Sequence, residues 1–159
     1  MLIKISKKIQ SNAIFDFEFN LLKREAENGI ASKQLELANL YANPESPVSD
    51  RKMAFFWYEK STMQDNLEAL IALSDVYFKG YGVSPNSDMG LFWLNKAVDF
   101  KDVNAILQLA QIYYFGMYGI SPNTSKAAEL YLSAAKKGHA IAQFQIGNIL
   151  YNGNGLKKC

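Results

Sequence analysis

The chain has 159 residues, of which 17 are Lys or Arg and 15 are Asp or Glu, so its formal net charge is +2 at pH 7. Hydrophobic residues make up 49% and charged residues 20% of the sequence, which excludes an intrinsically disordered chain. The longest unbroken apolar run, residues 53–58, is too short to cross a bilayer, and we expect no membrane insertion. The only cysteine is Cys159, so a disulfide or a cysteine metal site within one chain is excluded and a cytoplasmic location is predicted.

Charge is distributed unevenly along the chain. Residues 1–10 carry three Lys and no acid, residues 11–102 have a net charge of −5, and residues 103–159 have a net charge of +4. The basic residues are dispersed and the pI is near 8.5, whereas a nucleic-acid-binding protein has a dense basic patch. We therefore expect no nucleic-acid partner. The predicted organisation is a basic N-terminal segment over 1–11, one repeat domain over 12–155, and a tail over 156–159.

The sequence repeats with a period of 36 or 37 residues. Tyr41, Tyr77 and Tyr113 are 36 residues apart, and so are Trp57 and Trp93. The sequence Val-Ser-Pro-Asn at 83–86 recurs as Ile-Ser-Pro-Asn at 120–123, one residue later than the period because Met117 is an extra loop residue. A partial fourth copy begins at 142, with Gly153 in the place of Gly116. A fixed period of this length indicates a stacked array of structural repeats.

Helical spacing of apolar residues predicts two helices in each repeat and no strand. In chain order, the predicted helices span 12–28, 33–43, 50–64, 68–79, 86–99, 104–115, 123–137 and 141–151. The alternation of Phe and acidic residues over 15–19 also fits a strand, but a clearly helical segment follows it directly. Gly80 and Gly116 are expected to end first helices in a left-handed conformation, and Asn86 to cap the next helix. In the first repeat, residues 42–47 replace the glycine loop.

One position in the first helix of each repeat carries a small residue, which would let two helix axes approach closely. The residues at this position are Ala38, Ser74, Ala110 and Gly147. The sequence stops after the first helix of the fourth copy. Apolar residues of that last helix, Ile146, Ile149 and Leu150, are therefore expected to be unprotected, and self-association through this helix is predicted.

These repeats resemble Sel-1-like repeats, which are short helix–turn–helix units related to tetratricopeptide repeats. The resemblance rests on residues that recur together, which in the second repeat are Ala69, Leu73, Tyr77, Gly80, Gly82, Val83, Trp93, Leu94, Lys96 and Ala97. It implies an all-α fold, a right-handed α-solenoid of about four helix–turn–helix repeats with a concave inner face. It also implies a role in holding other proteins, as adaptors do in signalling, in protein quality control and in bacterial interaction with hosts or competitors.

Catalytic and cofactor chemistry finds little support in the sequence. His139 is the only histidine, and we read it as a polar turn residue, since a catalytic base also needs an oriented nucleophile. Asp99 and Asp102 flank a turn and are expected to act as solvated helix caps. The glycine loops lack the pattern of a phosphate-binding loop. We therefore predict no catalytic residue, no metal and no cofactor.

Partner-binding residues are predicted from the face of each first helix opposite its small residue. Asn39, Asp75, Gln111 and Asn148 form a polar column there, for which a merely solvated stripe is the alternative. Aromatic residues fall beside the column, for which burial between repeats is the alternative, and residues such as Phe144, one turn earlier, are expected to be partly buried. The complete predicted partner-binding set is Asn39, Asp75, Phe78, Lys79, Gln111, Tyr114, Phe115, Asn148 and Tyr151.

The predicted function is a non-enzymatic module that binds a partner protein or peptide in its concave groove. A narrower form of this hypothesis is a bacterial immunity protein or inhibitor that covers a toxin or effector, since the charge imbalance suits an electrostatically complementary surface. The alternatives are a signalling or quality-control adaptor fragment of a longer repeat protein and, more remotely, a hydrolase or small-ligand receptor using Asp75.

Overall fold

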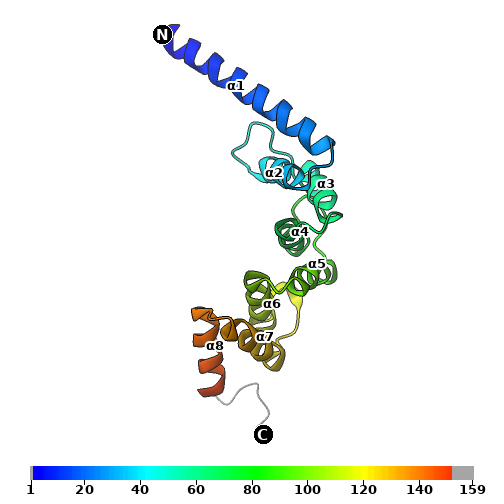
Figure 1. Ribbon diagram of the computed structural model, residues 1–159, viewed down its shortest axis with the longest axis vertical. Coiled ribbons are helices and arrows are strands. Elements are labelled where there is room, and N and C mark those ends of the chain that lie inside the picture. Colours follow the sequence, from blue (N-terminus) through cyan, green and yellow to red (C-terminus); the bar gives the residue numbers. More distant parts are fainter. Residues whose placement is uncertain (1, 152–159) are drawn as a thin grey trace. The chain divides into compact units, whose positions relative to one another are not determined.

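The structure, a computed structural model, describes the backbone of residues 2–151 and the side chains of residues 13–151 (Figure 1). This part of the chain contains eight α-helices, one 3-10 helix and no strand. The α-helices are α1 (Leu2–Glu27), α2 (Ala31–Ala42), α3 (Arg51–Thr62), α4 (Leu67–Lys79), α5 (Ser87–Asp99), α6 (Val103–Phe115), α7 (Thr124–Lys136) and α8 (Ala140–Tyr151). The 3-10 helix η1 (Met117–Gly119) lies between α6 and α7.

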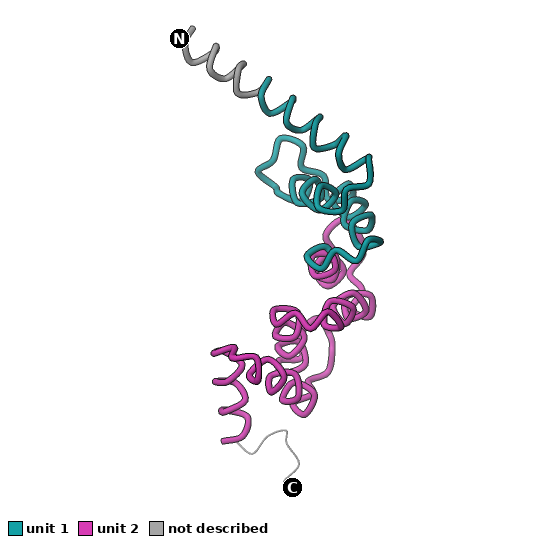
Figure 2. Tube along the Cα trace, in the orientation of Figure 1, with its two compact units in different colours: residues 1–69 teal, residues 70–159 magenta. Residues whose placement is uncertain are grey.

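The chain divides into two compact units (Figure 2). Unit 1 comprises residues 1–69 and holds α1, α2 and α3; unit 2 comprises residues 70–159 and holds α5 to α8, while α4 begins in unit 1 and continues into unit 2. The predicted domain limits at 12 and 155 remain predictions. The basic side chains of residues 1–11, Gly153 and the tail with Cys159 lie outside the described side chains.

Seven of the predicted helices, α2 to α8, are confirmed with bounds within about two residues. The predicted start of α1 at residue 12 is wrong, because the helix begins at Leu2. Residues 2–11 contain neither Gly nor Pro, so nothing in this segment interrupts a helix that continues through 15–19. The phenylalanines of 15–19 therefore lie on a helix.

One backbone hydrogen bond closes the hairpin of each of the first three repeats. The carbonyl of the recurring tyrosine accepts a hydrogen bond from the N–H of the residue that caps the following helix. The three bonds are Asp50 to Tyr41 at 2.9 Å, Asn86 to Tyr77 at 2.8 Å and Asn123 to Tyr113 at 2.7 Å. The first repeat therefore closes in the same way as the others although its loop sequence differs.

The side chains of the same capping residues satisfy free N–H groups at the helix starts. Asp50 accepts hydrogen bonds from the N–H groups of Lys52 and Met53, and Asn86 accepts one from Met89. At the start of α7, the Asn123 side chain accepts a hydrogen bond from the N–H of Lys126. The predicted cap at Asn86 is confirmed. Asp102 caps α6 by accepting from the N–H of Ala105, as expected for an acid at this turn.

Two glycines end first helices in unit 2 as predicted. Gly80 has φ of +71° and Gly116 has φ of +68°, a region that glycine enters at no steric cost. A Cβ at Gly80 would lie 2.6 Å from Cγ of Pro85, and a Cβ at Gly116 would lie 2.7 Å from Cγ of Pro122. Each loop thus requires glycine both for its dihedral angle and for close approach of the proline ring.

Residues in the left-handed backbone conformation also recur at the turns that follow α1, α3, α5 and α7. They are Gly29, Asp65, Lys101 and Gly138, with φ of +87°, +54°, +58° and +83°. Two of these four turns therefore hold a non-glycine residue in a conformation that costs L-amino acids about 1 kcal/mol. The turn geometry is set by the repeat rather than by the local residue.

Buried small residues let the helices pack as the sequence predicts, except at the last position. Ala38 in unit 1 and Ser74 and Ala110 in unit 2 are fully buried. Gly147 is exposed, and a Cβ added there would meet nothing within 4 Å. The core of unit 2 joins α6, α7 and α8 around Tyr131, whose hydroxyl pKa is raised by burial.

Candidate functional site

The four residues of the predicted polar column, Asn39, Asp75, Gln111 and Asn148, differ in solvent exposure. In unit 1 Asn39 is exposed. In unit 2 Gln111 is exposed, whereas Asp75 and Asn148 are half-buried. Every member therefore has some access to solvent, and the binding role of the column remains a prediction.

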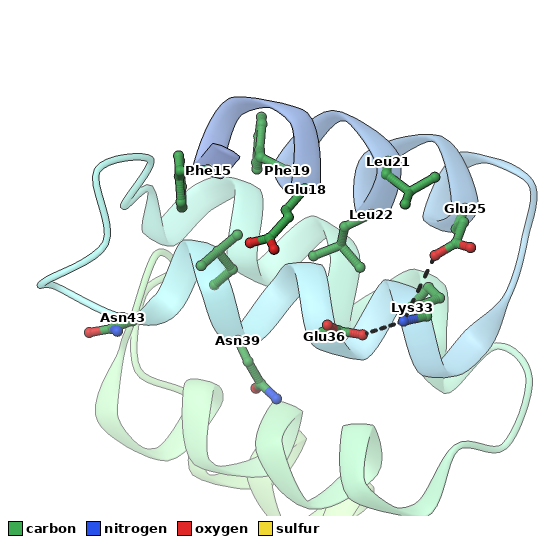
Figure 3. Close-up of a pocket in the computed structure, with 11 residues that line it drawn as sticks. Phe15, Glu18, Phe19, Leu21, Leu22, Glu25, Lys33, Glu36, Asn39 and Asn43 are labelled. Carbon is green, nitrogen blue, oxygen red and sulfur yellow. Dashed lines mark hydrogen bonds and ion pairs between the residues drawn. The ribbon is translucent and has the colours of Figure 1, made fainter. Parts of the chain in front are cut away.

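Asn39 carries a hydrogen bond within unit 1. Its Oδ1 accepts a hydrogen bond of 2.7 Å from the Tyr58 hydroxyl, so the α3 tyrosine fixes the amide group. Asn39 also lies at the edge of a groove between α1 and α2, where its side chain points away from α1 (Figure 3). The amide nitrogen is left as the donor for an incoming group.

Asp75 is held by two neighbours in unit 2. One carboxylate oxygen accepts a hydrogen bond of 2.8 Å from Gln108 Nε2, and the other pairs with Lys79 Nζ at 2.9 Å. The hydrogen bond that Lys79 donates to Asp75 raises the pKa of Lys79. Gln108 belongs to α6, so this bond links the first helices of two successive repeats. Asp75, Lys79 and Gln108 thus stabilise the contact between α4 and α6. Lys79 is the exposed residue of the three.

The predicted exposure of Phe78 is wrong. Its side chain is only 5% exposed and stacks on the ring of Tyr118 with a centroid separation of 4.5 Å. The ring lies so close to Gly90 of α5 that a Cβ there would be 2.5 Å from two ring carbons. The loop insertion that includes Met117 and the missing side chain at Gly90 together create a site that buries Phe78.

The aromatic residues of α6 differ from Phe78. Tyr114 is half-buried and makes edge contacts with the rings of Phe115 at 4.9 Å and Tyr131 at 6.2 Å. Phe115 is 61% exposed. Since Gln111 is four residues before Phe115, these two exposed side chains lie on the same face of α6. The predicted exposure is thus confirmed for Gln111 and Phe115.

The last described helix exposes a different set of residues from the one predicted. Ile146 and Ile149 are buried against α6 and α7, so the prediction that they are unprotected is wrong. Leu150 is exposed as predicted, and Tyr151 is 92% exposed. Phe144 is 67% exposed, so the expectation that it is partly buried is wrong. Self-association through α8 remains a prediction.

Sequence reasoning missed the groove between α1 and α2 in unit 1 (Figure 3). The groove has a volume of about 660 Å³. The signal for it was present, because Phe15, Phe19, Leu22 and Ala26 have the spacing of one helix face. The alternation over 15–19 obscured that spacing. The full lining is Phe15, Glu18, Phe19, Leu21, Leu22, Glu25, Lys33, Glu36, Asn39, Leu40 and Asn43.

Groups suited to catalysis or metal binding do not converge in the part of the chain with described side chains. No three His, Cys, Asp or Glu residues gather there in a way that would hold a metal ion. His139 is half-buried, and its Nδ1 has no hydrogen-bond partner among the described atoms. None of the described helices combines the length and the apolarity needed to cross a membrane.

Comparison with curated proteins finds partial relatives. The chain is 33% identical over 101 residues to chitin synthase regulatory factor 3 of Schizosaccharomyces pombe, and this match covers 60% of the chain and 11% of that protein. It is 28% identical over 123 residues to an uncharacterized protein of Neisseria meningitidis serogroup B, covering 77% of the chain and 25% of that protein. The chain thus spans a quarter or less of the length of these two relatives.

Solved structures share the fold. A protective antigen present in uropathogenic Escherichia coli strains, which displays an SLR fold, matches with a TM-score of 0.79 and 24% identity over 89% of the chain and 30% of that protein. A Sel1 repeat protein from Oxalobacter formigenes matches with a TM-score of 0.74 and 23% identity over 89% of the chain and 56% of that protein. The predicted fold class, an all-α helical repeat solenoid, is confirmed.

The Sel1 repeat model matches four segments of the chain, residues 34–66, 67–99, 103–139 and 140–158. The first three segments contain the helix pairs α2–α3, α4–α5 and α6–α7, and the fourth contains α8. Sel1 repeats are generally protein–protein interaction modules, and their fold is typically a non-catalytic scaffold. Because the four segments cover most of the sequence, the chain belongs to the Sel1 repeat family.

Proposed function

We propose that this chain is a non-enzymatic module that binds a protein or peptide partner through the exposed face of its first helices. The observation that carries the proposal is the exposed pair Gln111 and Phe115 on α6. An exposed phenylalanine contributes nothing to the core, and large aromatic side chains supply much of the energy of protein interfaces. An amide one turn away supplies both a donor and an acceptor for a partner backbone.

The neighbours of Phe115 keep its ring in place before a partner binds. Tyr114 meets the Phe115 ring edge-on at 4.9 Å, and Tyr114 itself contacts the fully buried Tyr131. A side chain that is already ordered loses less conformational entropy on binding, typically about 0.5–1.5 kcal/mol for a rotamer-rich group. Preorganisation of this kind supports a binding role over a merely solvated stripe.

The test is affinity capture with the intact chain, followed by mass spectrometry and a measured Kd for the captured partner. Gln111→Ala combined with Phe115→Ala is expected to weaken that Kd at least tenfold. Phe92→Ala is the matched control, because Phe92 is an exposed phenylalanine on α5, a second helix. Unchanged binding by the Gln111/Phe115 variant, with or without an effect at Phe92, would refute the proposal.

A narrower form of this function is a protein that covers and inhibits a toxin or effector. The net charges of −5 over 11–102 and +4 over 103–159 favour a partner with a complementary surface. Co-expression with each captured partner distinguishes this role from that of an adaptor. An inhibitor restores the growth of cells that express the partner, whereas an adaptor leaves growth unchanged.

A further inference from the structure

The groove between α1 and α2 has an apolar interior. Phe15, Phe19, Leu22 and Leu40 are half-buried along it, and Leu21 is exposed at its edge. Its volume of about 660 Å³ lies within the range of ordinary ligand sites. In Figure 3, Glu18 and Leu22 extend from α1 toward α2, so both helices contribute to the walls.

Aromatic contacts hold this interior in shape. The rings of Phe15 and Phe19 lie nearly parallel with centroids 6.1 Å apart. Phe19 in turn meets the ring of Tyr41 edge-on at 6.0 Å. Because Tyr41 is buried in α2, these contacts tie the α1 wall of the groove to the core of unit 1.

The rim of the groove carries an excess of negative charge. Three carboxylates, Glu18, Glu25 and Glu36, line it together with one ammonium group, that of Lys33. Lys33 Nζ lies 2.8 Å from Glu36 and 3.8 Å from Glu25 (Figure 3). The hydrogen bond to Glu36 raises the pKa of Lys33. Among the side chains of residues 13–151, Glu18 makes no ion pair.

A carboxylate beside an apolar surface defines the chemistry of the occupant. Three negative charges against one positive charge repel anions such as nucleic acid phosphates and acidic lipid headgroups. A partner helix with apolar side chains spaced three and four residues apart would place them against Leu21, Leu22 and Leu40. Side-chain ridges of one helix pack into the grooves of neighbouring helices in this way. Lys or Arg residues flanking that stripe would reach Glu18.

We propose that the α1–α2 groove of unit 1 binds a basic amphipathic helix of a partner protein, with Glu18 pairing with a cationic side chain of that helix. The proposal rests on the proposed protein-binding function and adds a second site with a stated partner chemistry. All residues that line the groove belong to unit 1, so the site shares no residue with the Gln111 and Phe115 surface of unit 2.

The test uses two synthetic helical peptides of 18 residues and fluorescence anisotropy with the intact chain. One peptide has Leu at helical spacings of three and four residues and Lys at the other positions; the second has Glu in place of every Lys. The Leu/Lys peptide is expected to bind at least tenfold more tightly than the Leu/Glu peptide. Equal binding of the two peptides would overturn the proposal.

Variants on α1 locate the bound peptide. Glu18→Lys is expected to weaken binding of the Leu/Lys peptide about tenfold, and Leu21→Ala about threefold, while Asp16→Asn changes nothing. Asp16 is the matched control because it is an exposed acid on the same helix that does not line the groove. Equal losses at Glu18 and Asp16 would show non-specific attraction and refute the site. Far-UV circular dichroism of each variant verifies that the helices remain folded.

The two proposals fail in different ways. Gln111→Ala with Phe115→Ala is expected to leave binding of the Leu/Lys peptide unchanged, because those residues belong to unit 2. If a partner is captured through Phe115 and neither peptide binds, the groove inference is wrong and the protein-binding function stands. If the peptide binds in a Glu18-dependent way and no partner depends on Phe115, the proposed Gln111 and Phe115 surface is wrong and the groove inference stands.

Discussion

Gly90 is a helical glycine whose replacement by alanine should destabilise unit 2. Alanine is the better helix former, so the substitution alone would favour α5 by about 1 kcal/mol. A Cβ at this position, however, would lie 2.5 Å from Cδ1 and Cε1 of Phe78. Phe78 is buried and stacked on Tyr118, so its ring must move to make room for the new methyl group.

The expected loss follows from three contributions. Forcing a buried ring from its packed position costs about 1–3 kcal/mol, and loosening its stack on Tyr118 costs about 1 kcal/mol more. Subtracting the gain of about 1 kcal/mol in helix propensity leaves a net destabilisation of about 1–3 kcal/mol. In a chain of this size, that corresponds to a decrease in Tm of about 2–12 °C.

Thermal and urea unfolding, followed by far-UV circular dichroism, measures this effect. Gly147→Ala is the matched control, because Gly147 is an exposed helical glycine of α8 and a methyl group added there would meet nothing within 4 Å. That variant should gain up to about 1 kcal/mol. Phe78→Leu should restore part of the stability lost by Gly90→Ala. A gain in stability at Gly90 equal to that at Gly147 would refute the reasoning.

Four further substitutions test three turn residues and a half-buried acid. Gly116→Ala should lower the free energy of unfolding by about 2 kcal/mol, because the residue has φ of +68° and its Cβ would meet Pro122. Gly119→Ala should lower it by about 1 kcal/mol, because Gly119 has φ of +76° but a Cβ there would meet nothing within 4 Å. The urea midpoints of the two variants measure the difference. Lys101→Gly should gain up to about 1 kcal/mol by relieving φ of +58°, seen as a rise in Tm in thermal scans. Burial raises the pKa of Glu59, so its favourable contribution is present below the unfolded-state pKa and is lost as pH rises through the folded-state pKa. Glu59→Gln should therefore gain more stability relative to the wild type at pH 7 than at pH 3, and an equal difference in urea unfolding at both pH values would contradict this.

Most of the fold was predictable because its signals are local and repeated. Gly80 and Gly116 end helices, Asn86 begins one, and each acts through a dihedral angle or a side-chain cap that depends on few neighbours. The start of α1 was not predictable in the same way. Residues 2–11 lack a stop signal, and a helix without a clear N-terminal cap has no boundary that the sequence marks.

Exposure within the candidate site was less predictable, since it depends on residues far along the chain. Phe78 and Tyr114 fall in the same column of the repeat, yet Phe78 is covered by Tyr118 from the loop after α6. The Ser87 hydroxyl donates a hydrogen bond to the carbonyl of Tyr118 and helps to hold that loop in place. Both contacts bring the loop after α6 against residues of the preceding repeat, so the helical spacing within one repeat does not predict which face is free.

Residues that recur from repeat to repeat and residues that differ between repeats have different roles in the proposals made for this chain. The backbone carbonyls of Tyr41, Tyr77 and Tyr113 close the hairpins, and this role belongs to the repeated architecture. The side chains that we propose for recognition are Glu18 on α1 and Phe115 on α6, which do not belong to the repeated pattern. Because Glu18 belongs to unit 1 and Phe115 to unit 2, we predict that substitutions at one leave binding at the other unchanged and that the free-energy effects of a Glu18 variant and a Phe115 variant add.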